Sequence, residues 1–202
     1  MDTLRVVALI PVKSLEFGKS RLADALDLEQ RIQLTEETLR RLIHVLSAEP
    51  RVTRIAVVTS DAHVIAWLAG RPVEHLTESG HGLNDALREA RTQLSTCDAL
   101  LVLPADLAAI TLHDVAAIID AAECTCASNR CIVIAPDRHD HGTNALLLRP
   151  PDVIDFAFGT DSAHLHAAAA AQQNAHVHFY RSDSIGLDLD LPEDYDLYTR
   201  QW

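Results

Sequence analysis

The sequence predicts an α/β fold, in which helices cover both faces of a mostly parallel sheet and give three layers. Short apolar runs alternate with amphipathic segments along the chain, an order that is typical of parallel sheets built from strand–helix units. Some runs, such as residues 99–103, are apolar at every position, as expected of strands that are buried on both faces. With 202 residues, 48% of them hydrophobic, the chain can form one sizeable core, and we expect a single domain spanning residues 1–202.

The expected strands are the runs rich in valine, leucine and isoleucine. They span residues 4–10, 54–59, 72–76, 99–103, 131–135, 144–148 and 177–180. Residues 185–191 form a further run of strict alternation. In a strand, Asp188 and Asp190 would share one face of this run, and Leu187, Leu189 and Leu191 would share the other.

The expected helices have apolar positions three and four residues apart, and several carry a start or stop signal. They span residues 29–47, 61–68, 85–94, 111–122 and 162–173, followed by a final helix from residue 192. Pro50 ends the first helix, Ser60 or Asp61 caps the second, and Thr111 caps the fourth. Pro192 opens the last helix at a first-turn position, where proline is well tolerated.

The composition narrows the classes of partner and location. The formal net charge is −12, which argues against nucleic acid or an anionic membrane as the main partner. An anionic ligand would therefore need a local basic site or a bridging cation. Residues 1–3 lack the features of a signal peptide, and no run approaches about 18 apolar residues, so we expect a cytoplasmic protein. The four cysteines match no paired zinc spacing, and free thiols are expected.

The loop after the first strand holds an unusual concentration of lysine. Lys13 and Lys19 are the two lysines of the chain, whereas every other basic residue, including Arg21 in the same loop, is arginine. Lysine is a compact and flexible charge that suits phosphate oxygens. The loop therefore predicts a polyphosphate site. The alternative is a solvated basic loop in a chain that is otherwise rich in arginine.

Three aspartates are candidates for binding Mg²⁺. Asp106 follows an apolar strand and Pro104, and the carboxyl end of a central parallel strand is a common place for a carboxylate that holds Mg²⁺ on a phosphate. Asp188 and Asp190, on one face of a strand, would repel each other unless a cation lies between them. The alternatives are that Asp106 caps a turn and that the aspartate pair lies on an exposed strand face.

Other polar segments give weaker signals. Gly82, Leu83 and Asn84 precede a helix, where glycine allows a ligand to approach the backbone closely, but an N-cap by Asn84 would explain the pattern equally well. Thr143 lies next to a glycine beside a strand start. Gly159 and Ser162 lie beside a helix start, where first-turn amides can bind a phosphate or carboxylate. Ordinary turns and caps are the alternative for each.

Histidine pairs spaced by two residues raise the possibility of a hydrolytic metal site, most plausibly at His139-Asp140-His141. The pair spacing recurs elsewhere in the chain and no glutamate-bearing helix motif accompanies it, so composition explains it better. The sequence contains no nucleophile elbow, no Walker A loop and no Gly-x-Gly-x-x-Gly motif.

Taken in order, several motifs of the chain resemble the CofC/FbiD guanylyltransferases of coenzyme F420 biosynthesis. The motifs are Ile10-Pro11-Val12-Lys13 with Lys19-Ser20-Arg21-Leu22, Gly82-Leu83-Asn84, Leu103-Pro104-Ala105-Asp106, Gly142-Thr143-Asn144-Ala145-Leu146, Phe158-Gly159 with Ser162 and His166, and Leu187-Asp188-Leu189-Asp190 with Pro192-Glu193-Asp194. They extend from residue 10 to residue 194. No single motif is specific, but the ordered set is.

The resemblance implies a Rossmann-like, glycosyltransferase-A-like nucleotidyltransferase fold. Related enzymes use a glycine-rich loop after the first strand, where this chain has Pro11-Val12-Lys13, so side-chain charge would replace much of the amide cradle. A second departure is Ala108, where we would expect proline. It would loosen the loop beside the metal and leave Asp106 intact.

The resemblance also implies roles for individual residues. Asp106, Asp188 and Asp190 would hold Mg²⁺. The triphosphate of GTP would face Lys13, Lys19, Ser20 and Arg21, with Lys19, Arg21 and Asp106 in the catalytic roles. The nucleoside would face Gly82, Leu83 and Asn84, and the small phospho-acid would face Thr143, Gly159 and Ser162.

The reaction implied is transfer of GMP from GTP to phosphoenolpyruvate or 2-phospho-L-lactate, with release of pyrophosphate. The residues alone indicate a site for a polyphosphate and a divalent cation, and they name neither guanine nor the acceptor. The alternatives are a nucleotidyltransferase that uses another base or acceptor, such as a molybdopterin or sugar-phosphate type, and a non-catalytic nucleotide-binding module. The oligomeric state cannot be inferred from the sequence.

Overall fold

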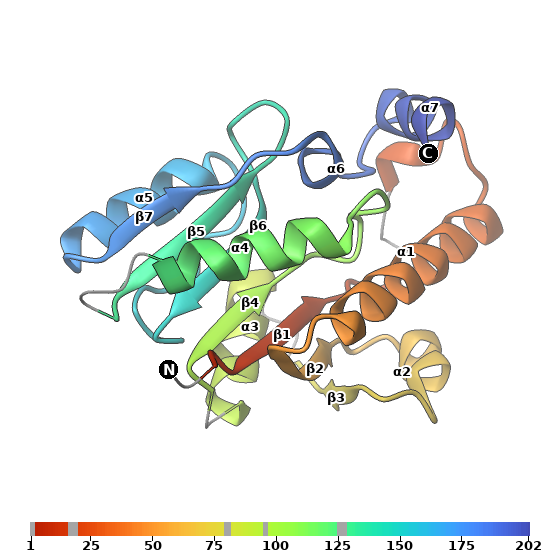
Figure 1. Cartoon of the computed structure of the whole chain (residues 1–202). Coiled ribbons are helices and arrows are strands. Elements are labelled where there is room, and N and C mark those ends of the chain that lie inside the picture. Colours follow the sequence, from red (N-terminus) through yellow and green to blue (C-terminus); the bar gives the residue numbers. More distant parts are fainter. Residues whose placement is uncertain (1–2, 16–19, 79–81, 95–96, 125–128) are drawn as a thin grey trace.

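A seven-stranded sheet forms the centre of the molecule in a computed structural model that describes residues 3–15, 20–78, 82–94, 97–124 and 129–202. The strands lie in the order β3-β2-β1-β4-β6-β5-β7 (Figure 1). Their bounds are β1 (Val6–Pro11), β2 (Val52–Val58), β3 (Glu74–Leu76), β4 (Ala99–Val102), β5 (Cys131–Pro136), β6 (Thr143–Arg149) and β7 (His176–Phe179). All neighbouring pairs are parallel except those of β6, which runs antiparallel to both β4 and β5. The mostly parallel sheet is therefore confirmed.

Helices cover both faces of the sheet, so the predicted three layers are confirmed (Figure 1). The helices are α1 (Leu28–Ala48), α2 (Ala62–Leu68), α3 (Leu83–Gln93), α4 (Leu112–Cys124), α5 (Ser162–Gln172), α6 (Asp183–Gly186) and α7 (Pro192–Gln201), with a 3-10 turn, η1 (Ser20–Leu22). Buried apolar side chains of α1, α2 and α4 pack in one core cluster, and those of α3 and α5 pack in another.

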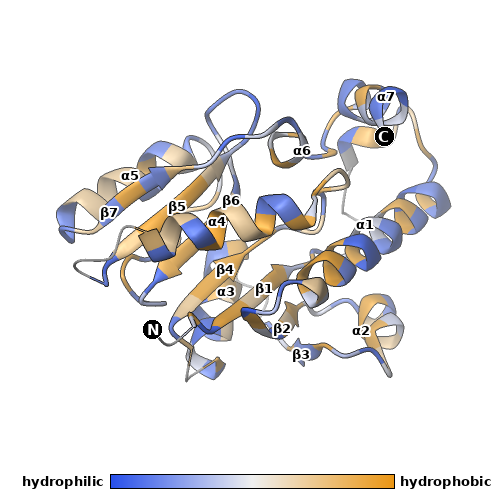
Figure 2. Cartoon of the chain, in the orientation of Figure 1, coloured by the Kyte–Doolittle hydropathy of each residue, from blue (hydrophilic) through white to orange (hydrophobic). Residues whose placement is uncertain are grey.

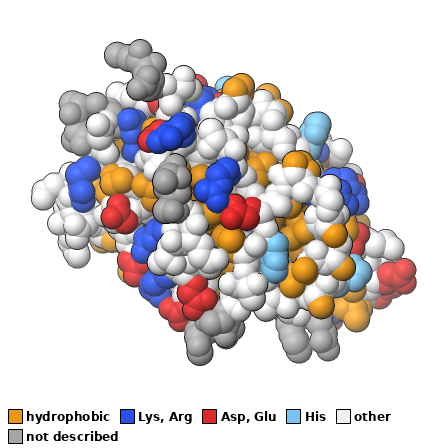
Figure 3. Space-filling view, turned by 90° about the horizontal axis from the view of Figure 1, so that it is seen from below, with side chains coloured by type: hydrophobic (Ala, Val, Ile, Leu, Met, Phe, Trp, Pro, Cys, Tyr) orange, Lys and Arg blue, Asp and Glu red, His pale blue; other side chains and the backbone are white. Residues whose placement is uncertain are grey.

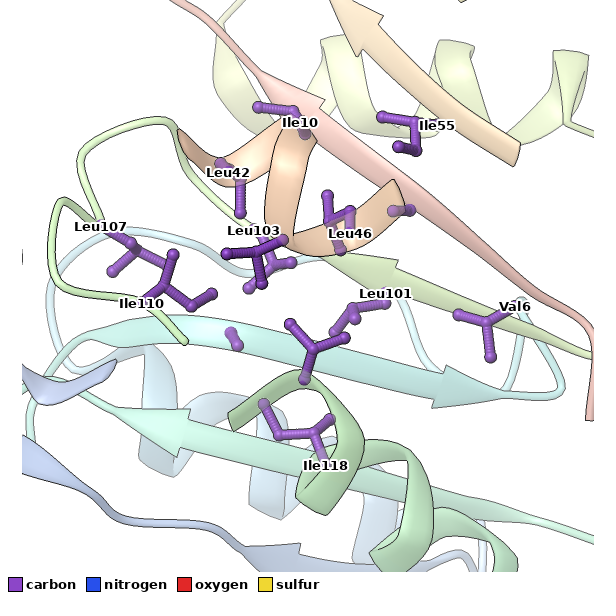
Figure 4. Packing of buried hydrophobic residues seen from close by; sticks show 14 of the residues in the cluster. Val6, Ile10, Leu42, Leu46, Ile55, Leu101, Leu103, Leu107, Ile110 and Ile118 are labelled. Atoms are coloured by element: carbon purple, nitrogen blue, oxygen red, sulfur yellow. The ribbon is translucent and has the colours of Figure 1, made fainter. Parts of the chain in front are cut away.

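The strands β1, β2, β4, β5 and β6 each contribute to both clusters because their side chains alternate between the faces. In β1, Val6, Ala8 and Ile10 belong to the cluster under α1 and α4. Val7 and Leu9 belong to the cluster under α3 and α5. Figure 4 shows Ile10 packed near α1 on the first of these faces, and Figure 2 shows apolar strands beneath helices whose outer faces are hydrophilic.

Acidic and basic side chains are mixed on the surface of the protein. Arginines are paired with nearby carboxylates, as in Arg54 with Glu74 and Arg88 with Asp155. On the face seen in Figure 3, basic side chains are scattered among acidic ones. In the described ranges, no helix is both long and apolar enough to span a membrane.

One prediction of local structure is wrong, and one alternative left open by the sequence is excluded. Residues 185–191 do not form a sheet strand: α6 ends at Gly186, and the next residues are extended and pair with a loop, because the N–H of Leu189 donates to the carbonyl oxygen of Asp106 at 3.1 Å. The alternation reflects burial of Leu187 and Leu189 in a small third cluster. The N-cap of α3 is Gly82, with φ of 103° and no side-chain cap, so Asn84 is not the cap.

The third cluster joins segments that are far apart in the sequence. It contains Leu22 of η1, Ala108 after β4 and Leu189, and side chains of α7 pack against it. In Figure 1, α7 lies beside the 3-10 turn. The C-terminal helix therefore holds η1, at the end of the predicted basic loop, close to the predicted acidic segment.

A buried carboxylate fixes the segment that leads to this acidic region. Asp114 on α4 accepts hydrogen bonds from the hydroxyls of Thr111, Tyr180, Ser182 and Ser184. Burial raises the pKa of Asp114, but the hydrogen bonds outweigh it, and the pKa lies below its usual range. The carboxylate thus ties α6 to α4 in its ionised form.

Replacing Asp114 with alanine should lower the free energy of unfolding by about 3 kcal/mol, because four partly buried hydroxyls would lose their acceptor. Urea unfolding followed by circular dichroism measures the change. Asp152→Ala, at an exposed position, is the matched control and should change the stability by less than about 0.5 kcal/mol. Equal effects of the two substitutions would contradict this account of Asp114.

Candidate active site

A cleft of about 700 Å³ opens at one edge of the sheet. The strands β1, β4 and β5 end at this edge, and β6 begins there because it runs antiparallel to its neighbours. The cleft is lined by Pro11, Val12, Lys13, Leu15, Arg21, Thr35, Leu83, Pro104, Ala105, Asp106, Asp137, His141, Gly142, Thr143, Asn144, Phe158, Gly159, Thr160, Asp161, Ser162, Asp188 and Asp190. Segments that the sequence separates by more than a hundred residues therefore meet at the ends of these strands, where open α/β sheets commonly bind ligands.

The three predicted aspartates come together in this cleft. Asp106, Asp188 and Asp190 each offer one carboxylate oxygen, and these oxygens all lie within 4.8 Å of one another. The backbone bond from Leu189 to the carbonyl of Asp106 holds the two segments together. Asn144 adds a side-chain link, since its Nδ2 donates to Asp188 Oδ1 at 3.2 Å and to the carbonyl of Ile185 at 2.9 Å.

The electrostatics of the cluster favour a cation. Burial, and then the charge of Asp106, raises the pKa of Asp188 to about 6, with Asp190 adding to the shift and the hydrogen bond from Asn144 opposing it. Arg21 lies 3.5 Å from Asp190, but both side chains are largely exposed, so the pair is screened by water. An all-oxygen set of three carboxylates fits a hard divalent cation such as Mg²⁺ or Ca²⁺.

The basic side of the cleft is formed by Lys13 and Arg21. The loop between them is anchored at Leu15, whose N–H donates to the α2 cap residue Asp61 at 2.8 Å. The side chain of Arg21 is 71% exposed, so it is open to a ligand. Lys19 lies outside the described residues, as does the side chain of Ser20.

Across the cleft, Thr143 and Ser162 form a buried hydroxyl pair. Ser162 Oγ donates to Thr143 Oγ1 at 3.0 Å. Gly159 has φ of 130°, and the space where a side chain would begin is open. Two amides expected to face an anion are engaged instead, because Ser162 N–H donates to Gly159 and Ala163 N–H donates to His141.

A hairpin loop sets the position of Thr143. Asp137 accepts the N–H groups of His139 and His141 at Oδ1 and that of Gly142 at Oδ2, at distances of 2.8 to 3.0 Å. A Cβ atom at residue 142 would lie 2.7 Å from Asp137 Oδ2. The glycine before Thr143 is therefore needed for the close approach of this carboxylate.

The residues predicted to face the nucleoside, Gly82, Leu83 and Asn84, do not all lie in the cleft. Leu83 lines the cleft, and Gly82 is exposed at the start of α3. Asn84 instead exchanges two hydrogen bonds with the backbone of Phe158, at 2.8 and 3.0 Å. It therefore connects α3 to the segment that carries Gly159.

Three residues near the site were given no role by the sequence argument. Asn144 and His166 occur within the motifs that carried the family resemblance. Each is a polar residue among apolar neighbours, a pattern that does not reveal its hydrogen-bond partner. Asp137 precedes a glycine by five positions, a spacing compatible with a side-chain-stabilised turn. The partners of these residues follow only from the fold.

Comparison with known proteins decides the family. The family described as guanylyl transferase, CofC like, matches residues 6–198. The chain belongs to this family. It is therefore an enzyme of the nucleotidyltransferase class, as the resemblance predicted.

Named relatives agree with this membership. A phosphoenolpyruvate guanylyltransferase from Rubrobacter xylanophilus is 39% identical over 193 residues, which cover 95% of this chain and 92% of the relative. A protein of the same name from Sphaerobacter thermophilus is 36% identical over 195 residues, which cover 96% of this chain and 92% of the relative. The similarity thus extends over nearly the whole length of this chain and of both relatives.

Solved structures of low sequence identity share the fold. CMP:2-keto-3-deoxy-manno-octonic acid synthetase in complex with CTP matches with a TM-score of 0.67 at 13% identity. The match covers 98% of this chain and 100% of the synthetase chain. The 4-diphosphocytidyl-2C-methyl-D-erythritol synthase from Anaerococcus prevotii has a TM-score of 0.66 at 12% identity, covering 99% of this chain and 100% of its own. The predicted nucleotidyltransferase fold of this family member is confirmed.

Replacing Asp188 with asparagine should stabilise the protein in a metal chelator at pH 8. The raised pKa, about 6 against 3.8 for an ordinary aspartate, means that folding is penalised when Asp188 is ionised. The full penalty, up to about 3 kcal/mol, applies above pH 6 and disappears as the pH falls toward 4. Urea unfolding of both proteins at pH 4, 6 and 8 measures the difference. A difference that does not change with pH would contradict the prediction.

Proposed function

We propose that the protein transfers GMP from GTP to phosphoenolpyruvate, giving enolpyruvyl-diphospho-5'-guanosine and pyrophosphate, and that it acts in the cytoplasm in coenzyme F420 biosynthesis. The observation that carries the proposal is one cleft that combines the three-aspartate cluster with a basic loop on one side and the Thr143–Ser162 hydroxyl pair on the other. The names of the full-length relatives support phosphoenolpyruvate over 2-phospho-L-lactate as the acceptor.

In the proposed reaction, a phosphate oxygen of the acceptor attacks the α-phosphorus of GTP. A new oxygen–phosphorus bond forms, the bond from the α-phosphorus to the oxygen bridging to the β-phosphorus breaks, and pyrophosphate leaves. The attacking phosphate is already ionised near neutral pH, so no strong general base is required. The contribution of the protein is positioning and neutralisation of charge.

The residues of the cleft would share these tasks. Lys13 and Arg21, with Lys19 from the same loop, would bind the triphosphate. Asp106, Asp188 and Asp190 would hold Mg²⁺, which when bound supplies positive charge against the phosphate oxygens.

The remaining sides of the cleft would hold the base and the acceptor. Leu83 and Gly82 would lie against the nucleoside, with Asn84 holding the segment behind them. Thr143, Gly159 and Ser162 would hold the acceptor.

Pyrophosphate release is the direct test of the proposal. GTP, ATP and CTP should each be combined with phosphoenolpyruvate, 2-phospho-L-lactate and 3-phosphoglycerate in the presence of Mg²⁺. We expect release only with GTP and phosphoenolpyruvate. Asp106→Asn should lower this rate by at least about a hundredfold while the protein stays folded, whereas Asp152→Asn, at an exposed position, should not. Release with another base or acid would replace the proposed substrates, and an active Asp106→Asn variant would reject the metal assignment.

Ser162→Ala should raise the KM for phosphoenolpyruvate by roughly threefold to tenfold and leave the KM for GTP nearly unchanged. The substitution removes a hydroxyl from the acceptor side alone, and one hydrogen bond is worth about 1 kcal/mol. Steady-state kinetics with each substrate varied in turn measure both constants. A larger change for GTP than for phosphoenolpyruvate would assign Ser162 to the nucleotide instead.

A further inference from the structure

A histidine behind the proposed acceptor side has a defined proton position. His166 on α5 is completely buried. Its Nε2 lies 3.0 Å from the backbone nitrogen of Ala157, which donates the hydrogen bond. Because a backbone N–H can only donate, Nε2 must present its lone pair and carries no proton.

The other ring nitrogen must then carry the proton of the neutral ring. Burial lowers the pKa of His166 to about 4, so the ring is neutral at physiological pH. Its Nδ1 lies 3.2 Å from Thr143 Oγ1. The edge contact with the ring of Phe158, at a centroid distance of 5.0 Å, also holds the ring. The Nδ1–H therefore donates to Thr143.

Thr143 Oγ1 thus accepts two hydrogen bonds within the protein. One comes from His166 Nδ1 and the other from Ser162 Oγ, at 3.0 Å. A hydroxyl oxygen has two lone pairs, so both are in use. Its own hydrogen must be directed elsewhere, and Thr143 lines the cleft.

We infer that His166 is a positioning residue that makes the Thr143 hydroxyl an obligate hydrogen-bond donor to the acceptor substrate. This inference rests on the proposed function, because it concerns the side of the cleft assigned to the phospho-acid. The hydroxyl selects an unprotonated oxygen of a carboxylate or phosphate. It cannot accept from an N–H or O–H at the same point, so a ligand that presents a donor there is disfavoured.

The proton position can be measured directly in the unmodified protein. Long-range ¹H–¹⁵N correlation spectra of protein labelled at histidine nitrogens distinguish the two neutral tautomers. We expect the Nδ1–H form for His166 at pH 7. The Nε2–H form would overturn the inference, and this readout depends neither on substrate nor on the folding of a variant.

Two substitutions separate the functions of the two ring nitrogens. In His166→Asn, the side-chain amide nitrogen can replace Nδ1 as the donor to Thr143. In His166→Gln, the amide oxygen can replace Nε2 as the acceptor for Ala157, and the donor to Thr143 is lost. We expect the glutamine variant to raise the KM for phosphoenolpyruvate by roughly threefold to tenfold, the asparagine variant to recover part of this loss, and the KM for GTP to change little in both.

A double-substitution cycle tests whether His166 acts through Thr143. In a Thr143→Val background, which lacks the hydroxyl, His166→Gln should have no further effect on the KM for phosphoenolpyruvate. The matched control is His75→Gln, because the Nε2 of His75 also contacts a backbone group, the carbonyl of Thr59, at 3.1 Å and His75 is outside the cleft. This control should leave both KM values unchanged.

The outcomes distinguish failure of the inference from failure of the proposed function. If the unmodified protein is active and the two substitutions change the KM for phosphoenolpyruvate independently, so that their effects multiply, the role of His166 is overturned and the proposed function is not. Absence of pyrophosphate release from the unmodified protein with GTP and phosphoenolpyruvate would reject the proposed function. The tautomer spectrum would then still decide whether Thr143 is held as a donor.

Discussion

Repulsion among three carboxylates is the constraint around which the cleft is organised. Asp106, Asp188 and Asp190 come from two segments that share no sheet pairing, yet their oxygens lie within 4.8 Å of one another. Such an arrangement disfavours folding unless a cation compensates the charge. The surrounding structure therefore has to hold the two segments in place.

Several separate contacts hold these segments. The N–H of Leu189 binds the carbonyl of Asp106, and Asn144 binds Asp188 from the start of β6. Further away, Asp114 anchors α6 through hydroxyl groups, and α7 packs on the small third cluster. The part of the chain from α6 to α7 thus serves to position two carboxylates, at some cost in stability, which is common for functional sites.

The fold was predictable because its signals are local and repeated. Continuous apolar runs marked the strands of a sheet buried on both faces, and periodic segments with recognisable caps marked the helices. The prediction for residues 185–191 was wrong because an alternating sequence indicates only which side chains are buried. The same alternation occurs in an extended segment that does not join a sheet. What Leu189 bonds to depends on the loop after β4, which lies far away in the sequence.

The site was predictable to a different extent. Asp106 was singled out because its residue type and its place at the end of a strand suggested its chemistry, and Asp188 and Asp190 because two carboxylates lie two positions apart in an alternating run. Thr143 was singled out because a glycine and a hydroxyl lie beside a strand start. The hydrogen bonds of Asn84 to Phe158 and of Ser162 to Thr143 were not, because pairing of this kind depends on the arrangement of α3 and α5 in space. The proton position on His166 requires even finer information, namely which atom faces the N–H of Ala157.

The reversed direction of β6 has an evolutionary consequence. The hairpin that it forms with β5 brings Thr143 to the cleft, and α5 follows soon after with Ser162 and His166. The residues proposed to hold the acceptor are thus encoded in one short stretch, residues 137–166. Those proposed to contact the triphosphate and the nucleoside lie before residue 85, and two of the three proposed metal ligands, Asp188 and Asp190, lie beyond residue 166. Mutation or recombination within that one stretch can therefore change which acid is accepted, while the machinery that binds the nucleotide is inherited unaltered.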